Sequence, residues 1–309
     1  MSLLEWMSHS KTRIRRDGVT IGLRESGYEF YVGMLRRLEP LKPDGENIFE
    51  KEWDLLVVLD SARVDAIQEV EAEYSFLDQP GTLRSVGSAS YQWMERTFTE
   101  QYADEMDATA YVTANHFADD FLEETDLFCL DSVWQYGWDE MKHTIPPRPV
   151  TDAAIRVGRE HRGEFDRCIV HYMQPHFPSI PDPVVDPEQT ADEPFDVQKS
   201  LWKKARNGSL DTDRLWAAYI ENLRYVLDDL ELLLENFEAE TVMISADHAN
   251  AFGEWGVYAH PNVPLDCLRV VPWYQTTSID KETYSPPTPD RKPMDEIDMD
   301  ERLQALGYK

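Results

Sequence analysis

Two apolar runs that each end in an aspartate restrict the fold of this chain most. WDLLVVLD (53–60) ends in Asp60, and TVMISAD (241–247) ends in Asp247. Continuous apolar runs of this length are typical of strands buried on both faces of a parallel sheet. Ligands bind where the carboxyl ends of such strands meet. We therefore expect Asp60 and Asp247 to lie at the ends of neighbouring strands, with carboxylates within roughly 6 Å of each other.

Further apolar runs at 108–113 and 167–173 predict two more strands, and helical patterns separate the runs. The clearest helix is expected over 213–237, where one apolar stripe recurs at steps of three and four: Trp216, Tyr219, Leu223, Val226, Leu230, Leu233 and Phe237. Strands that alternate with helices indicate an α/β fold. We predict a doubly wound, mostly parallel sheet flanked by helices.

The 309 residues fit one large α/β domain or two small ones, and one is preferred because the chain has no internal repeat or central linker. We predict an N-terminal helical arm over 1–50, with one helix near 28–38, and an α/β domain over 51–275. A Pro-rich tail over 276–309 should end in a short helix, ERLQALGY. The acidic, Pro-rich segment 181–196 is expected to be a long exposed loop.

The charge excludes one class of partner, because 30 Lys and Arg against 59 Asp and Glu give a net charge of −29. Nucleic-acid binding needs a basic surface and is not expected. The acidity indicates a surface suited to concentrated salt, or a cationic substrate. No run approaches the ~18 apolar residues of a membrane helix, and the first 18 residues lack the apolar core of a signal peptide. We expect no transmembrane segment and a cytoplasmic location.

Several histidines follow the predicted strands. His248 stands beside Asp247, and a carboxylate next to an imidazole is a good metal-binding pair. His260 follows a Gly-containing loop, and HYMQPHFP holds His171 and His176. Each histidine taken alone is more often an ordinary packed or surface residue, and Asp60 alone is as readily a helix N-cap. The clustering of these residues at strand ends favours a metal site.

A nucleophile is available in the turn RSVGSAS, which precedes an apolar helix. The turn offers Ser85, Ser88 and Ser90, and a hydroxyl at a helix N-terminus lies beside free N–H groups that favour an anion. Ser90 is the favoured nucleophile because it stands next to the helix, and Ser88 is the rival. Simple N-capping is the alternative role for any of the three.

Four segments together resemble the alkaline phosphatase/sulfatase superfamily, and in particular its short, acidic, sulfatase-like halophile proteins. They are VVLDSARVDA, SVGSASYQWMERTF, HYMQPHFP and ISADHANAFGEWGVYAHP, in the order of the family. The resemblance implies an alkaline phosphatase-like fold. It also implies one or two divalent ions, Zn, Mn or Mg, whose ligands are Asp60, Asp247, His248 and His260.

The same resemblance implies that Ser90 is the covalent nucleophile, that His176 assists catalysis, and that Arg63, Asn115 and His171 bind substrate. The implied function is hydrolysis or transfer of phosphoric esters through a phosphoserine, on a small-molecule or glycan-linked phosphate or sulfate ester. A sulfuric-ester hydrolase is the alternative. The sulfatases of the family need a Cys or Ser in a CxPSR-like motif that becomes formylglycine, but no Cys lies near residues 84–98, and Ser90 is followed by Tyr91 and Gln92. A superfamily scaffold with little turnover and a binding or assembly role is the other alternative.

Overall fold

The computed structural model describes residues 3–184 and 197–289, and its centre is a seven-stranded sheet in the order β2-β9-β6-β1-β5-β3-β4. The strands are β1 Leu55–Leu59, β2 Thr82–Arg84, β3 Thr109–Thr113, β4 Cys129–Ser132, β5 Arg167–Tyr172, β6 Ala239–Ser245 and β9 Val270–Ser278. Strands β6, β1, β5, β3 and β4 pair in parallel, whereas β9 runs antiparallel to both β6 and β2. The predicted mostly parallel α/β sheet is confirmed.

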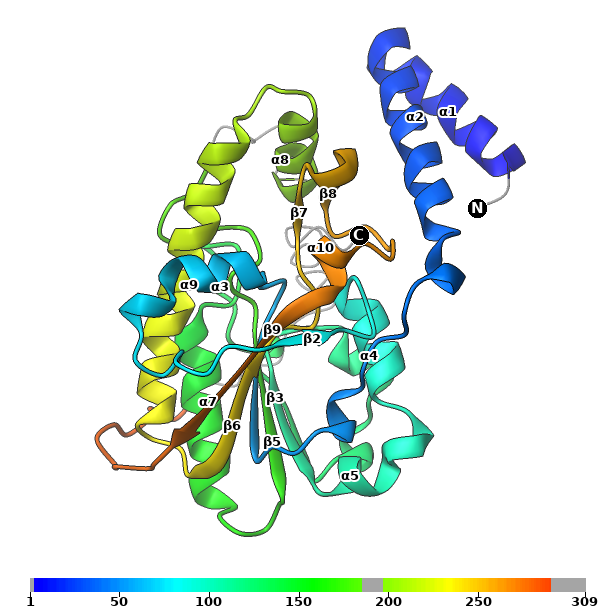
Figure 1. Cartoon of the computed structure of the whole chain (residues 1–309). Helices are drawn as coiled ribbons and strands as arrows, with labels where there is room; N and C mark the ends of the chain where they lie inside the picture. The colour runs from blue at the N-terminus through cyan, green and yellow to red at the C-terminus, as the bar shows by residue number, and fades with distance from the viewer. Residues whose placement is uncertain (1–2, 185–196, 290–309) are drawn as a thin grey trace.

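Helices cover both faces of the sheet (Figure 1). On one side lie α3 Val64–Val70, α7 Pro147–Glu160 and α9 Thr212–Leu234, and on the other lie α4 Ser90–Thr97 and α5 Ala103–Asp107. The remaining α-helices and strands of the described residues are α1 Leu3–Asp17, α2 Val19–Arg36, α6 Ala118–Phe121, α8 Val197–Arg206, α10 Asp266–Arg269 and the hairpin strands β7 Ala251–Phe252 and β8 Tyr258–Ala259.

The apolar patterns explain these elements. All five side chains of β1 are buried, as a central strand with helices on both faces requires. Helix α9 spans nearly the predicted range, and its stripe is buried in the core from Tyr219 to Leu233. Burial of a complete apolar face against the sheet is the main source of stability for such a helix.

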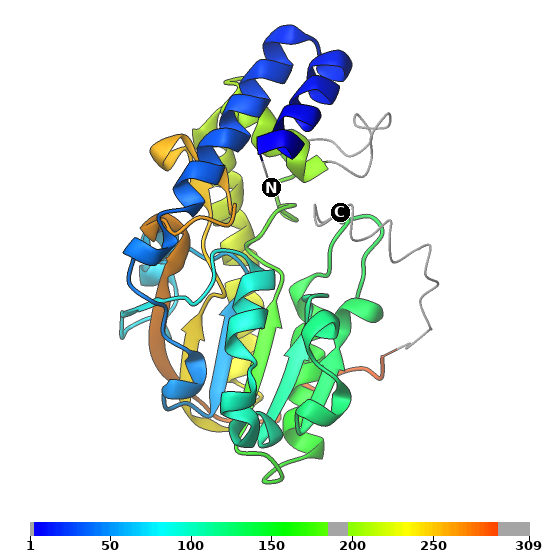
Figure 2. The ribbon, with the colours of Figure 1, turned by 90° about the vertical axis from the view of Figure 1, so that its right-hand side faces the viewer.

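The N-terminal region differs from the prediction of one helix near 28–38. Two helices, α1 and α2, form a hairpin, seen at the top of Figure 2. The sequence of α1 mixes apolar, polar and basic residues, so its pattern did not predict a helix. Residues 185–196 of the predicted loop, and 290–309 with the predicted C-terminal helix, lie outside the described residues.

Three strands of the sheet were not predicted. β2 has only three residues. β9 contains Pro272, which lacks the N–H that a strand normally donates, and β4 is the mixed sequence CLDS. Within the described residues, no helix is long and apolar enough to cross a membrane.

Candidate active site

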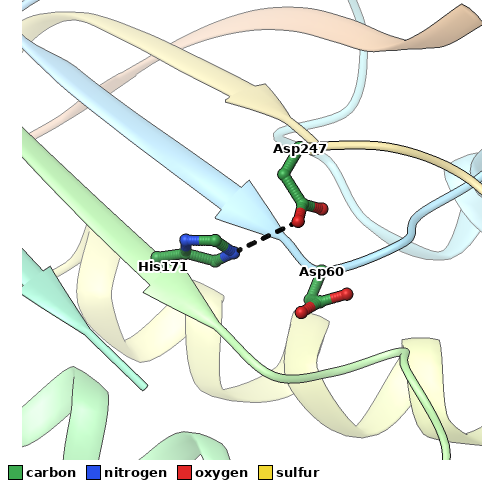
Figure 3. Close-up of side chains that lie close together, drawn as sticks. All are labelled: Asp60, His171 and Asp247. Carbon is green, nitrogen blue, oxygen red and sulfur yellow. Dashed lines mark ion pairs between the residues drawn. The ribbon is translucent and has the colours of Figure 1, made fainter. Parts of the chain in front are cut away.

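Asp60 and Asp247 lie side by side at the carboxyl ends of the paired strands β1 and β6. Both are fully buried. Three side chains meet here: those of Asp60, Asp247 and His171 of β5. Each offers one possible ligand atom, and these three atoms lie within 4.8 Å of one another. Figure 3 shows the three side chains converging. The expected neighbouring position of the two aspartates is confirmed. Asp60 is not a helix cap, because α3 begins at Val64 with Arg63 as its N-cap.

Three buried polar atoms in this group have no hydrogen-bond partner: Asp60 Oδ1, Asp247 Oδ2 and His171 Nε2. Unpaired buried polar atoms are costly, and a bound ion is one partner that satisfies them. The other carboxylate oxygens are paired. Asp247 Oδ1 accepts from the backbone N–H groups of Ser61 and His248, at 3.1 and 2.9 Å. The open atoms therefore all belong to one small volume between the three side chains.

His248 directs its Nε2 atom toward the same volume. That atom lies 3.7 Å from Asp60 Oδ1 and 3.5 Å from Asp247 Oδ2. The other ring nitrogen, Nδ1, lies 3.1 Å from the carbonyl oxygen of Ala249. Because a carbonyl only accepts, Nδ1 carries the proton and Nε2 presents its lone pair. This is the tautomer of a metal-binding histidine whose second nitrogen is held by the protein.

Burial dominates the electrostatics of the group. Burial, and then the neighbouring Asp247, raise the pKa of Asp60 well above its ordinary value, and burial raises the pKa of Asp247 as well. Burial lowers the pKa of His171 and of His248 to about 4, so both imidazoles are neutral near pH 7. Two carboxylates and two neutral imidazoles form a donor set for a cation. The residues therefore fit a divalent metal.

Ser90 is the serine of the RSVGSAS turn that reaches this group. Its Oγ lies 3.4 Å from Asp60 Oδ2 and 3.3 Å from His248 Nε2. The hydroxyl of Ser88 instead donates to Gln92 Oε1 at 3.0 Å, and that of Ser85 donates to the carbonyl oxygen of Asp247.

The turn that places Ser90 needs a glycine at position 87. A Cβ at Gly87 would lie 2.6 Å from the backbone nitrogen of Trp93, so this approach to α4 requires its absence. Ser90 is the first residue of α4, after Ala89 in extended conformation.

His176 and His260 form a second pair beside the first group. Their Nε2 atoms lie 3.0 Å apart, and the ring of His260 stacks on that of His248 with centroids 4.5 Å apart. Burial is the main cause that lowers the pKa of His176 and His260 well below the ordinary value. The sequence-predicted metal ligand His260 thus lies next to the Asp60–Asp247 group but is not one of the three residues that converge in it.

The three residues expected to bind substrate occupy different positions. His171 belongs to the carboxylate group itself. Asn115 holds Asp60, because its Nδ2 donates to Asp60 Oδ2 at 3.2 Å. The guanidinium of Arg63 pairs with Asp65 at 2.6 Å and Glu254 at 2.7 Å. It also donates to a backbone carbonyl at 2.6 Å. These contacts give no support to a substrate-binding role for Arg63.

Sequence reasoning missed two residues that shape the group. Tyr111 of β3 contacts His171 Nδ1 at 2.9 Å. Ser61 has a φ of 61°, which is rare for a residue with a side chain, and this turn directs its N–H to Asp247. Tyr111 carried no signal because it alternates with apolar residues in an ordinary strand pattern. Ser61 could have been suspected from its place directly after a strand-ending aspartate.

No known protein-family profile matches the sequence, and no curated protein matches it. Solved structures do match. The soluble domain of lipooligosaccharide phosphoethanolamine transferase A from Neisseria meningitidis is 13% identical, with a TM-score of 0.45, over 75% of this chain and 79% of that one. The C-terminal periplasmic domain of EcEptC from Escherichia coli, solved with Zn, is 10% identical, with a TM-score of 0.47, over 77% of each chain.

A 2-O GAG sulfatase is also similar, at 11% identity and a TM-score of 0.47, over 81% of this chain and 66% of that one. The structural neighbours are therefore phosphoethanolamine transferases and sulfatases, members of the alkaline phosphatase/sulfatase superfamily. At these identities the similarity concerns the fold. The chemistry of this chain has to be argued from its own residues.

Proposed function

We propose that this chain is a metal-dependent enzyme of the alkaline phosphatase/sulfatase superfamily that hydrolyses or transfers phosphoric esters, with Ser90 as the covalent nucleophile. One observation carries the proposal. The Ser90 hydroxyl lies 3.4 Å from Asp60 and 3.3 Å from His248, at a buried group whose open atoms suit a cation. A nucleophile beside a metal-binding group is the arrangement that activates a hydroxyl for attack on phosphorus.

The residues that would hold the metal are Asp60, Asp247, His248 and His171. Two imidazoles with two carboxylates suit Zn²⁺ or Mn²⁺ better than Mg²⁺, which prefers oxygen ligands and water. When bound, the ion would lower the pKa of the serine hydroxyl and offset the negative charge of the ester. The inclusion of His171 revises its expected role from substrate binding to metal binding.

The chain supplies the other parts of the reaction. Asp60 Oδ2 accepts the Ser90 hydroxyl hydrogen and so orients an oxygen lone pair for attack. Ser90 begins α4, whose first N–H groups are free to hold phosphoryl oxygens. His176 and His260 lie beside this position and are neutral, so an N–H of the pair can donate to the leaving oxygen. Burial of Asp60, Ser90 and His176 excludes water and strengthens their electrostatic contacts, whereas His260 is half-buried.

The test is to trap the covalent intermediate. Purified protein is assayed with an aryl phosphomonoester, an aryl phosphodiester and an aryl sulfate, with Zn²⁺, Mn²⁺ or Mg²⁺ added in turn, in dilute and in molar KCl. Samples from the active condition are quenched in acid, and the modified residue is located by mass spectrometry of peptides. We expect phosphate on Ser90 and no sulfate-ester turnover.

Ser90→Ala and Ser88→Ala are the matched pair for this test. Ser90→Ala should bind the metal with nearly unchanged affinity and form no phosphoserine, whereas Ser88→Ala should form it. Phosphate on Ser88, or full turnover by Ser90→Ala, would place the nucleophile elsewhere. A protein that binds no divalent ion would refute the enzymatic proposal and leave a scaffold role.

A further inference from the structure

The helix α2 presents three faces, and two of them are packed. Toward the body of the protein, Val32 is buried among apolar side chains of the segment 251–268, and the Tyr31 hydroxyl donates to the carbonyl oxygen of Trp255 at 2.8 Å. Toward α1, a Cβ at Gly22 would lie 2.5 Å from the Cα of Ile14, and Trp6 donates to the carbonyl oxygen of Ser26 at 3.0 Å. The hairpin is thus held firmly on two sides.

Next to the side that faces α1, α2 carries an exposed apolar stripe, in which the Phe30 ring also contacts Trp6 of α1 at a centroid distance of 5.6 Å. Val19, Leu23, Phe30 and Met34 are 64%, 57%, 48% and 49% exposed. Steps of four, seven and four residues place these side chains along one side of a helix. Of the twelve large apolar side chains that are exposed in the described part of the chain, seven fall within residues 6–38. Contiguous exposed apolar surface of this kind marks an interaction site.

The net charge of the hairpin is opposite in sign to that of the whole protein. Residues 6–38 hold seven of the 30 Lys and Arg but only three of the 59 Asp and Glu. Two of those acids are paired, Glu25 with Arg206 and Glu29 with Arg13. Among the described side chains of this segment, every exposed charged one is a cation: Lys11, Arg15, Arg24, Arg36 and Arg37. The hairpin is therefore an apolar and basic element on an acidic protein.

We propose that the helical hairpin α1–α2 binds the surface of an anionic lipid bilayer, with the stripe Val19, Leu23, Phe30 and Met34 inserted among the headgroups. An amphipathic helix with apolar residues on one side and Lys or Arg beside them is the element that lies in a membrane interface. Basic side chains near an anionic surface add electrostatic attraction to this insertion. The anionic bilayer also repels the acidic body of the protein, but physiological salt screens this repulsion beyond about 8 Å.

A second copy of the chain is a poorer occupant. If two hairpins paired through their stripes, the exposed cations of both would be brought together and would repel. If the stripe bound the acidic body instead, it would need an apolar counterpart there. Beyond residue 41, however, the exposed large apolar side chains of the described residues are only Tyr91, Met141, Trp255 and Ile279, which lie far apart in the sequence. An anionic lipid surface satisfies both the apolar and the basic parts of the hairpin.

The experiment is flotation of the full-length protein with vesicles of phosphatidylcholine alone or of phosphatidylcholine mixed with phosphatidylglycerol. We expect the wild type to float only with the mixed vesicles, and molar KCl to weaken this binding. The double variant Leu23→Gln/Met34→Gln should reduce the partition coefficient by at least about tenfold, since two apolar side chains are lost from the interface. Lys11→Glu/Arg37→Glu should reduce it as well.

The control is Met141→Gln/Ile279→Gln, which removes two exposed apolar side chains from the body and should bind like the wild type. Circular dichroism and the thermal midpoint establish that each variant is folded. The proposal fails if the wild type floats with neither vesicle, or if the stripe variant binds as well as the control. It also fails if light scattering shows a wild-type dimer that the stripe variant converts to a monomer, because a second copy would then cover the stripe.

Discussion

The hydroxyl of Tyr111 lies 2.9 Å from His171 Nδ1 and 3.7 Å from the sulfur of Met94. If the hydroxyl hydrogen is directed to the sulfur, the phenolic oxygen accepts from Nδ1–H, and His171 Nε2 then presents its lone pair toward Asp247 Oδ2, 3.9 Å away. In that orientation Tyr111 does for His171 what the Ala249 carbonyl does for His248. The carbonyl can only accept, so it fixes the tautomer of His248, whereas the Tyr111 hydroxyl selects the same tautomer for His171 when it accepts from Nδ1.

Tyr111→Phe should weaken Zn²⁺ or Mn²⁺ binding by about 10-fold, because loss of a partner that orients a metal-binding histidine typically costs 10- to 100-fold in affinity. Isothermal titration calorimetry of the metal alone measures this without any substrate. Tyr172→Phe is the matched control, since Tyr172 is equally buried and pairs with Thr151 at 2.9 Å. Equal metal affinities for the two variants would show that Tyr111 only packs.

Asp60→Asn should stabilise the metal-free protein at about pH 8, by roughly 1–3 kcal/mol. The native pKa of Asp60 is raised, so the native state holds this proton more tightly than the unfolded state. The native state therefore loses stability as the pH rises above the ordinary pKa of 3.8, because the buried carboxyl must ionise. The uncharged amide of Asp60→Asn does not ionise, so the variant does not lose this stability. Urea unfolding in the presence of a chelator measures the effect.

Asp229→Asn provides the contrast for this prediction. Asp229 pairs with Arg148 at 2.7 Å, so its loss should destabilise the protein. Asp60→Asn should also lose the stabilisation that an added divalent ion gives the wild type. A variant that unfolds more easily than the wild type without metal would mean that Asp60 has a purely structural role.

Metal affinity should fall as the pH is lowered from about 8 to about 5, by up to about tenfold per pH unit for each carboxyl that takes up a proton. The raised pKa values of Asp60 and Asp247 make protons compete at a higher pH than for ordinary carboxyls. His171 and His248, with pKa values of about 4, stay neutral over this range. Asp152→Asn, at a buried carboxyl in α7, should leave the pH dependence unchanged.

Arg63→Gln should lower the free energy of unfolding by about 1–3 kcal/mol, because it removes charged hydrogen bonds to Asp65 and Glu254. The KM for an aryl phosphate should change by less than about threefold, since these contacts already occupy the guanidinium. A rise in KM of more than about tenfold with unchanged stability would instead restore the substrate-binding role inferred from the sequence.

The sequence alone determined the four central parallel strands of the sheet, β6, β1, β5 and β3, and the place of the two aspartates. The apolar runs ending at Asp60 and Asp247 are long enough to specify buried parallel strands, and parallel strands must end at one edge of the sheet. The strand patterns at 108–113 and 167–173 were correct for the same reason, because burial on both faces of a sheet leaves a continuous apolar run in the sequence. The helix pattern at 213–237 was correct because burial of one helix face leaves an apolar stripe. Helix α1 and strands β2, β4 and β9 leave no such pattern.

Only the tertiary structure decided which polar side chains meet. His171 and His176 are five residues apart, yet His171 faces the two aspartates and His176 faces His260. Ser88 and Ser90 are similar in sequence context, but the direction of α4 brings only Ser90 to Asp60. Arg63 is engaged by Glu254, far along the chain. Such contacts depend on how strands and helices are packed in space, and a local pattern of residues does not carry that information.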